Sequence, residues 1–156
     1  MKKNLNKKEY LLWVNELISK GKTVQVKVEG MSMFPFLLGK DVVKIKQVNK
    51  KSLKRGDVVL FIRDEQLIAH RILKVNKSSI ITRGDGNLKQ DYPIEKDKIK
   101  GKVISIIKSR TFLAEQSLKY GSIIAIATPV TGPLFYGIGL GIYKIKTHLT
   151  NLFRTK

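Results

Sequence analysis

Residues 58–75 read VVLFIRDEQLIAHRILKV, two runs of apolar and β-branched residues on either side of the polar Asp64-Glu65-Gln66. Two such runs joined by a short polar turn are typical of a β-hairpin. His70 shares strand parity with Ile68 and Ile72, so we expect its ring to face the apolar side of the second strand. This stretch therefore predicts a β domain with one histidine turned toward its core.

Similar runs occur on both sides of this hairpin. Val24, Val26 and Val28 alternate with polar residues, which predicts a half-buried strand. Many short strands at such spacing favour a small antiparallel β-barrel or sandwich, and this is the fold class that we predict. The predicted strands cover 24–28, 42–45, 58–62, 67–75, 79–82 and 103–107.

The two ends of the chain have a different pattern. Residues 5–19 carry apolar residues at helical spacing, Asn6 and Glu9 are spaced as a capping box, and Gly21 is a stop signal. A short helix is expected over 111–119. The organisation that we predict is an amphipathic helix in 1–22, a catalytic β domain over 23–110, and a C-terminal helix, hydrophobic segment and basic tail in 111–156.

The segment 120–143 contains no charged residue. As a helix it would be ~36 Å long, enough for a hydrocarbon core of ~30 Å. Two prolines and four glycines weaken an uninterrupted helix, so an interfacial segment and a buried terminal hairpin stay open as alternatives to insertion. We expect membrane association through this segment, with a cytoplasmic location as the alternative. The residues that interrupt it are Pro129, Gly132, Pro133, Gly137, Gly139 and Gly141.

Composition limits the remaining possibilities. The chain has 156 residues, 42% hydrophobic and 28% charged, which is globular and excludes a disordered or collagen-like protein. It has no cysteine and two histidines, so neither a disulfide scaffold nor a metal centre is expected, and no cofactor is predicted. The net charge of +19 comes mostly from lysine, which favours a solvated surface or an anionic membrane over specific nucleic-acid recognition.

Three places could carry chemistry. Ser32 lies in Gly30-Met31-Ser32-Met33-Phe34-Pro35, a sharp turn that would expose a nucleophile and leave backbone N–H groups free for an oxyanion. His70 has the right kind of side chain for a serine's base. The loop after Thr82 supplies Asp85 and Asp91, either of which could orient an imidazole. Taken singly, a turn serine and a core histidine are the simpler interpretations, and the other histidine, His148, is a weak candidate.

In chain order these places resemble the boxes of type I signal peptidases. The boxes are Ser32-Met33 with Pro35, Gly39-Lys40-Asp41, Gly56-Asp57-Val58-Val59, His70-Arg71, and Gly84-Asp85 through Asp91. The resemblance covers about residues 24–107 and implies a β-rich fold shared with LexA-like self-cleaving repressors. Because a histidine and not a lysine precedes the arginine, the chain is similar to the Ser-His branch of the endoplasmic reticulum and archaea.

This resemblance implies a role for each matching residue. Ser32 would be the nucleophile, His70 the general base and Asp91 the third catalytic member, with Asp85 in a supporting position. Met31 and Met33 would line the substrate pockets. The substrate would be a precursor protein or leader peptide bound as an extended strand, and its signal or leader peptide would be cleaved off.

The sequence also departs from the family pattern. Gly30 stands where bacterial members often carry a hydroxyl, so a second oxyanion donor must come from elsewhere. Gly86 replaces the usual asparagine after Gly-Asp, and a charged helix occupies the place of an N-terminal membrane helix. Two alternatives stay open. One is a non-catalytic basic β-barrel that binds nucleic acid or an anionic membrane, and the other is a LexA-like self-cleaving regulator, for which only 22 residues precede the first strand.

Overall fold

Strand β3 (Val58–Arg63) lies at the centre of an antiparallel sheet of seven strands in the order β1-β2-β7-β3-β4-β5-β6. The computed structural model describes residues 6–154, so residues 1–5 and 155–156 of the predicted end segments lie outside it. The other strands are β1 (Val24–Lys27), β2 (Val42–Lys46), β4 (Gln66–Val75), β5 (Ser79–Arg83), β6 (Ile94–Glu95) and β7 (Ile99–Lys108). The prediction of a mainly β, antiparallel fold is confirmed.

The hydrophobic core lies on both faces of β3 because its side chains alternate between two buried clusters. Val58 and Leu60 belong to a cluster that also contains Val14 and Ile18 of the first helix. Val59 and Phe61 belong to the second cluster, on the other face. A strand buried on both faces reads as a continuous apolar run, which explains the sequence VVLFI.

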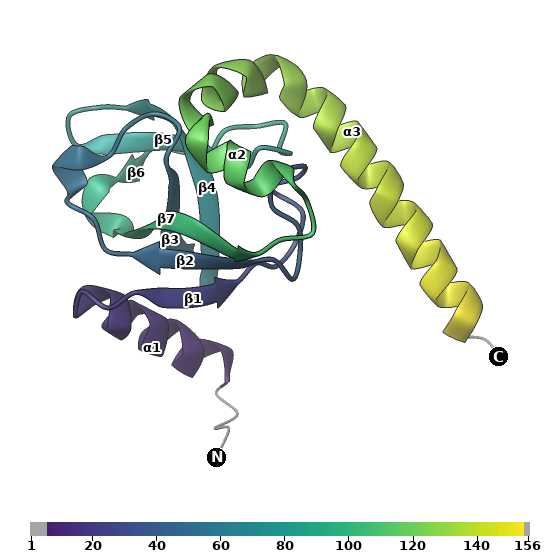
Figure 1. Ribbon diagram of the computed structural model, residues 1–156, viewed down its shortest axis with the longest axis horizontal. Coiled ribbons are helices and arrows are strands. Elements are labelled where there is room, and N and C mark those ends of the chain that lie inside the picture. Colours follow the sequence, from purple (N-terminus) through teal and green to yellow (C-terminus); the bar gives the residue numbers. More distant parts are fainter. Residues whose placement is uncertain (1–5, 155–156) are drawn as a thin grey trace.

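Helix α1 (Lys7–Ser19) begins as the sequence predicts. The Asn6 side chain accepts a hydrogen bond from the Glu9 N–H, and the Glu9 side chain accepts one from the Asn6 N–H, so the capping box is formed. The chain leaves the helix through Gly21 at φ +72°, a conformation that glycine adopts without strain. Figure 1 shows α1 beneath β1, at the end of the sheet.

Two parts of the sheet differ from the prediction. Strand β7 begins at Ile99 instead of residue 103, because Lys100 and Lys102 alternate with the buried Ile99 and Gly101 and obscure the apolar pattern. A side chain at Gly101 would lie 2.8 Å from the Ile45 side chain, so only glycine lets β2 and β7 come this close. The two-residue strand β6 is too short for a recognisable pattern.

The C-terminal part of the chain is helical. Helix α2 (Leu113–Lys119) is followed at once by α3 (Gly121–Arg154), and the close approach of Gly121 to Gly56 leaves no space for a side chain at either position. Ser122 Oγ and Arg55 Nη2 add hydrogen bonds across this junction, to the carbonyl oxygens of Arg55 and Ala125. The start of α3 is therefore attached to the turn before β3.

Helix α3 is sharply bent. Its segments Gly121–Ala127 and Thr131–Gly139 meet at 83°, and Pro129 lies between them, where proline interrupts helical hydrogen bonding. After the bend, α3 runs away from α2 past the side of the domain (Figure 1). Within the described residues no single helix is long and apolar enough to cross a membrane, although the bent pair meets the length and hydropathy requirements when taken together.

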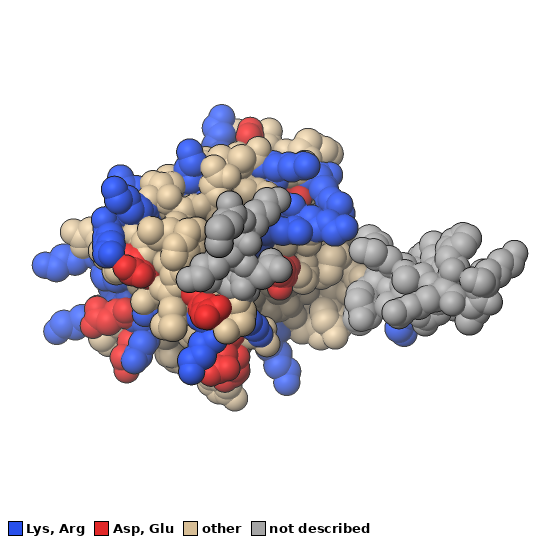
Figure 2. All heavy atoms as spheres, turned by 90° about the horizontal axis from the view of Figure 1, so that it is seen from below, with Lys and Arg blue, Asp and Glu red and all other residues tan. Residues whose placement is uncertain are grey.

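The surface charge is spread out. Figure 2 shows Lys and Arg side chains distributed around the visible face and interspersed with Asp and Glu, with no single basic patch. This distribution is that of a solvated lysine-rich surface on the face shown.

Candidate active site

The first element of the site is the turn that carries Ser32. After β1 the chain reverses through Gly30 at φ +74°, and the turn is closed by hydrogen bonds from the Phe34 and Phe36 N–H groups to the carbonyl oxygens of Met31 and Met33. The Met33 and Leu37 side chains are 2% and 0% exposed and anchor the turn in the core. Ser32 itself, directly before Met33, stays half-buried.

A second loop packs directly against this turn. The Gly86 N–H donates a 2.9 Å hydrogen bond to the Ser32 carbonyl oxygen. A side chain at Gly84 would collide with the same oxygen, and one at Gly86 would lie 3.0 Å from the Phe34 carbonyl oxygen. The glycines of Gly84-Asp85-Gly86 therefore allow the loop after β5 to hold the Ser32 backbone, which accounts for the unusual Gly86.

His70 lies in β4 and is paired with Asp91. Its ring is 3% exposed, and Nδ1 lies 2.7 Å from Asp91 Oδ2. The Phe61 ring meets the imidazole edge-on, with the ring centroids 6.0 Å apart. His70 thus faces the apolar side of its strand, as its parity with Ile68 and Ile72 predicts. An imidazole held through Nδ1 keeps Nε2 for another partner.

Asp91 is held in place by three other contacts. Thr82 Oγ1 donates a 2.7 Å hydrogen bond to Oδ2, and Arg63 Nη1 donates one of 2.9 Å to Oδ1. The Asp91 N–H also donates to the Thr82 carbonyl oxygen, which fixes the backbone. Burial opposes ionisation of this carboxyl, but the hydrogen bonds from His70, Thr82 and Arg63 outweigh it and lower the pKa of Asp91. Asp91 therefore faces the imidazole as a carboxylate.

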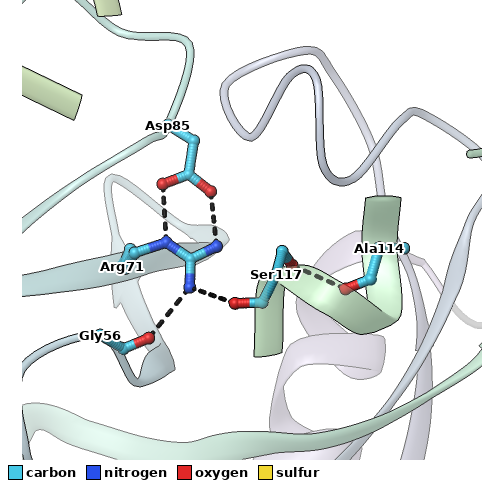
Figure 3. Close-up of polar contacts among 5 residues, drawn as sticks. All are labelled: Gly56, Arg71, Asp85, Ala114 and Ser117. Atoms are coloured by element: carbon cyan, nitrogen blue, oxygen red, sulfur yellow. Dashed lines mark hydrogen bonds and ion pairs between the residues drawn. The ribbon is translucent and has the colours of Figure 1, made fainter. Parts of the chain in front are cut away.

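The neighbour of His70 forms a separate ion pair with the other carboxylate of the loop. Arg71 is fully buried, and its Nε and Nη2 donate to the two Asp85 oxygens at 2.8 and 2.7 Å. Its Nη1 donates to the carbonyl oxygens of Gly56 and Ser117, at 3.0 and 2.9 Å (Figure 3). Burial raises the pKa of Asp85, and the hydrogen bonds from Arg71 oppose that rise. Arg71 thereby joins the loop beside Ser32 to the turn before β3 and to α2.

The predicted site residues are thus partly assembled. His70 and Asp91 are in direct contact, and the Ser32 turn and Asp85 belong to one hydrogen-bonded unit. Within residues 6–154 the Ser32 hydroxyl forms no hydrogen bond with His70; in free enzymes such bonds are often long and tighten on substrate binding. Met33 is buried in the core, which leaves Met31 as the partly exposed methionine. The His148 side chain lies outside the described part of the chain.

Sequence reasoning missed Arg63, Thr82 and Arg83. The first two contact Asp91, and their positions follow from the pairing of β3 with β4 and of β4 with β5. The pairing of Ile72 with Thr82 brings the threonine to the strand that carries His70. The alternation of side chains in the predicted strand 79–82 was a signal that could have identified Thr82. The sequence does not show where the loop from Gly84 to Gln90 brings Asp91 back to the sheet.

The described residues contain no group of three or more His, Cys, Asp or Glu side chains that could hold a metal ion. The arrangement offers instead a serine hydroxyl on a rigid turn, an imidazole oriented by a carboxylate, and backbone N–H groups at the turn. These are the components of acyl transfer by a serine nucleophile.

Comparison with known families gives a match over the same region. The model of the Peptidase S24-like family matches residues 2–104, about two thirds of the chain. The chain belongs to the Peptidase S24-like family. This family has the fold shared by LexA and signal peptidases, so the fold expected from the sequence boxes is confirmed. A search of curated proteins gives no significant match.

Family membership supports a coarse activity. The chain is a serine-peptidase-type hydrolase at the level of the family, which also includes self-cleaving regulators of the LexA type. The match spans Ser32, His70 and Asp91, and it ends within β7, before α2 and α3.

Proposed function

We propose that the protein is a serine endopeptidase that removes signal or leader peptides from precursor proteins, with Ser32 as nucleophile, His70 as general base and Asp91 as the residue that orients the base. The observation that carries this proposal is the 2.7 Å contact between His70 Nδ1 and Asp91 Oδ2. A purely structural core histidine does not require a carboxylate that is itself held by Thr82 and Arg63.

The chemistry follows from this pairing. His70 Nε2 takes the proton of the Ser32 hydroxyl while Oγ attacks the scissile carbonyl carbon, and Asp91 stabilises the imidazolium that forms. When the tetrahedral intermediate collapses, His70 gives this proton to the leaving amine. A water molecule, deprotonated by the same histidine, then hydrolyses the acyl-enzyme and regenerates the Ser32 hydroxyl. The Ser32 N–H is the proposed oxyanion donor.

The substrate is proposed to bind as an extended strand. Strand β1 is at the edge of the sheet and leads into the Ser32 turn three residues beyond its end at Lys27. A peptide added to such an edge gains main-chain hydrogen bonds, and its side chains alternate toward the protein. The partly exposed Met31 is the candidate for contact with the small residues that the resemblance to signal peptidases implies.

Helix α3 is proposed to associate with a membrane. Apolar side chains on its described part are exposed, and Lys119 and Lys144 are the first charged residues on either side of its apolar stretch. Lysines beside an apolar helix suit contact with anionic headgroups. The exposed apolar side chains are Ile123, Ile126, Leu134, Tyr136 and Ile138.

The test is N-terminal peptide profiling by mass spectrometry in host cells that produce either the wild type or Ser32→Ala. We expect precursors with an intact signal or leader to accumulate only with Ser32→Ala, and fractionation of the same cells to place the protein with membranes. Asp97→Asn, which removes an exposed carboxylate that is not among the residues assigned to the site, is the control and should behave as the wild type.

Two other outcomes would contradict the proposal. If the wild type cuts only its own chain, while Ser32→Ala stays intact and precursors are unchanged, the protein is a self-cleaving regulator. If the profiles agree and both proteins are present at equal levels, Ser32 is a turn residue, and binding of nucleic acid or lipid by a basic β domain becomes the better explanation. In that case raised salt should abolish binding, while Ser32→Ala and His70→Ala should not affect it.

A further inference from the structure

Arg83 is a buried cation, two of whose nitrogen atoms have no hydrogen-bond partner within residues 6–154. It ends β5 and is 5% exposed, and its Nε and Nη2 atoms are buried with no hydrogen-bond partner among the described residues. The adjacent carboxylate is held by another arginine: both Asp85 oxygens accept hydrogen bonds from Arg71, and in the part of the chain that the structure describes neither buried nitrogen of Arg83 donates to them. Burying a charge without hydrogen bonds is strongly unfavourable, so a guanidinium with two unpaired nitrogen atoms at such a position needs an explanation.

The charges around Arg83 leave an excess of one positive charge. Arg71 and Arg83 lie opposite each other in the pairing of β4 with β5, so their side chains share a face of the sheet. Asp85 balances one of the two guanidinium groups. The other acidic residue of the loop, Asp91, is bound to His70, Thr82 and Arg63. An anion at Arg83 would complete the charge balance.

This cation lies beside the proposed nucleophile. Gly84, the next residue, packs so closely on the Ser32 carbonyl oxygen that no side chain fits there. The backbone next to Arg83 is therefore fixed against the Ser32 turn. The two unpaired atoms, Nε and Nη2, form the edge of the guanidinium that receives a carboxylate through two parallel hydrogen bonds.

Helix α3 covers this position. A Cβ atom at the buried Gly132 would lie 3.3 Å from Arg83 Nη2 and 3.2 Å from the Asn87 carbonyl oxygen. A Cβ atom at Gly139, farther along the helix, would lie 3.7 Å from the Phe34 ring of the Ser32 turn. Gly132 thus lets α3 lie closely against the loop after β5 and over Arg83, while Gly139 is at ordinary contact distance from the Ser32 turn.

We propose that Arg83 is a binding site for a carboxylate of the peptide substrate, an Asp or Glu side chain near the scissile bond, and that α3 covers the site at Gly132 until the substrate displaces it. This proposal rests on the proposed function only in taking the ligand to be a peptide. Peptide binding can be measured without catalysis, so the binding site and the peptidase function can fail independently.

The experiment uses full-length Ser32→Ala protein and two blocked alanine-rich peptides that differ only in one residue, Glu or Gln. Affinity is measured by calorimetry, and the Nε–H resonance of Arg83 is followed by NMR, with acetate as the free-anion probe. We expect the Glu peptide to bind roughly tenfold more tightly than the Gln peptide and to shift the Arg83 resonance. The preference for the Glu peptide should disappear in the double variant Ser32→Ala/Arg83→Gln.

Equal affinity for the Glu and Gln peptides would overturn the proposal. This holds even if acetate shifts the Arg83 resonance, because Arg83 would then bind a free anion and not the peptide carboxylate. A Glu preference that persists without Arg83 would overturn it as well. A preference for Glu combined with an unchanged precursor profile would contradict only the peptidase function, because binding and cleavage are measured independently.

A second pair of variants tests whether α3 covers the Arg83 site and leaves Arg83 itself unchanged. Gly132→Leu places a side chain against Arg83 and Asn87 and should force α3 away, which raises the affinity for the Glu peptide several-fold. Gly137→Leu is the matched control, because a Cβ atom there meets nothing within 4 Å and the gain in helix propensity is the same. Unchanged or weaker binding in Gly132→Leu would show that α3 does not cover the site.

Discussion

Neighbouring residues on β4, His70 and Arg71, each bind a carboxylate from the same loop, and the two pairs differ in what they can do. The His70–Asp91 pair has a titratable member, and its carboxylate also contacts Thr82 and the half-exposed Arg63. The Arg71–Asp85 pair is fully buried, bidentate and permanently charged on the arginine side. One strand thus carries a pair suited to proton transfer on one face and a structural pair on the other.

The buried Arg71–Asp85 pair explains how the His70–Asp91 pair and the Ser32 turn stay in place. Arg71 fixes Asp85, and Asp85 lies between the two glycines that contact the Ser32 turn. The same guanidinium holds Gly56 and Ser117, so the turn before β3 and the C-terminal helices are joined to the loop. The position of Ser32, the proposed nucleophile, relative to His70 therefore depends on an ion pair that takes no part in the proposed reaction.

The largest expected effect is a loss of activity when the His70–Asp91 pair is changed. Asp91→Asn should reduce kcat by about 10⁴-fold, as the loss of the orienting carboxylate does in other serine peptidases, because the amide favours the wrong imidazole tautomer. Steady-state cleavage of a precursor substrate measures this change. Thermal unfolding should shift less than in a variant of the buried Arg71–Asp85 pair, since the amide oxygen still accepts a hydrogen bond from Thr82 or Arg63. A variant that retains more than a tenth of the activity would assign Asp91 a structural role.

The next largest effect is a loss of stability when the Arg71–Asp85 pair is changed. Asp85→Asn leaves the buried Arg71 unpaired and should lower the free energy of unfolding by about 3–5 kcal/mol. Denaturant unfolding measures the loss. The double variant Arg71→Met/Asp85→Leu should recover part of it, since removing both charges avoids an uncompensated one. A loss below about 1 kcal/mol for Asp85→Asn would show that the pair does not hold the loop, because even one unpaired buried polar group costs that much.

The smallest effect concerns acid stability. The pKa of Asp91 is lowered on folding, so Asp91 adds stability above the ordinary carboxyl pKa that is lost as the pH falls through its folded value. Unfolding free energies measured across the acid range should therefore fall less steeply in Asp91→Asn than in the wild type. The same slope in both proteins would contradict this assignment.

Much of the β domain was predictable because its signals are local. The alternation in 24–28 and the two apolar runs of the 58–75 hairpin each predict a strand without reference to the rest of the chain. Strand parity also placed His70 correctly on the apolar face. The start of β7 and the two-residue β6 were missed, because lysines and a very short length conceal the pattern.

The C-terminal segment shows the opposite case. An uncharged stretch from 120 to 143 is compatible with a membrane helix, an interfacial helix or a buried hairpin, since all three satisfy the same hydropathy. The structure has a helix bent by 83° that is attached at Gly56 and lies closely against Arg83 at Gly132. Contacts of this kind depend on a surface that the segment itself does not encode.

Local sequence patterns specify six of the seven strands, the capped first helix, a serine on a turn and a histidine on an apolar face, because these features depend on neighbours within a few residues. The sheet pairing is what brings Asp91 to His70, as the family resemblance implies, buries Met33 as an anchor of the turn, and leaves two nitrogen atoms of Arg83 without a hydrogen-bond partner among the described residues. Those outcomes depend on how β4 and β5 pair and on where a loop returns. Charges from distant parts of the chain meet only after the sheet has formed.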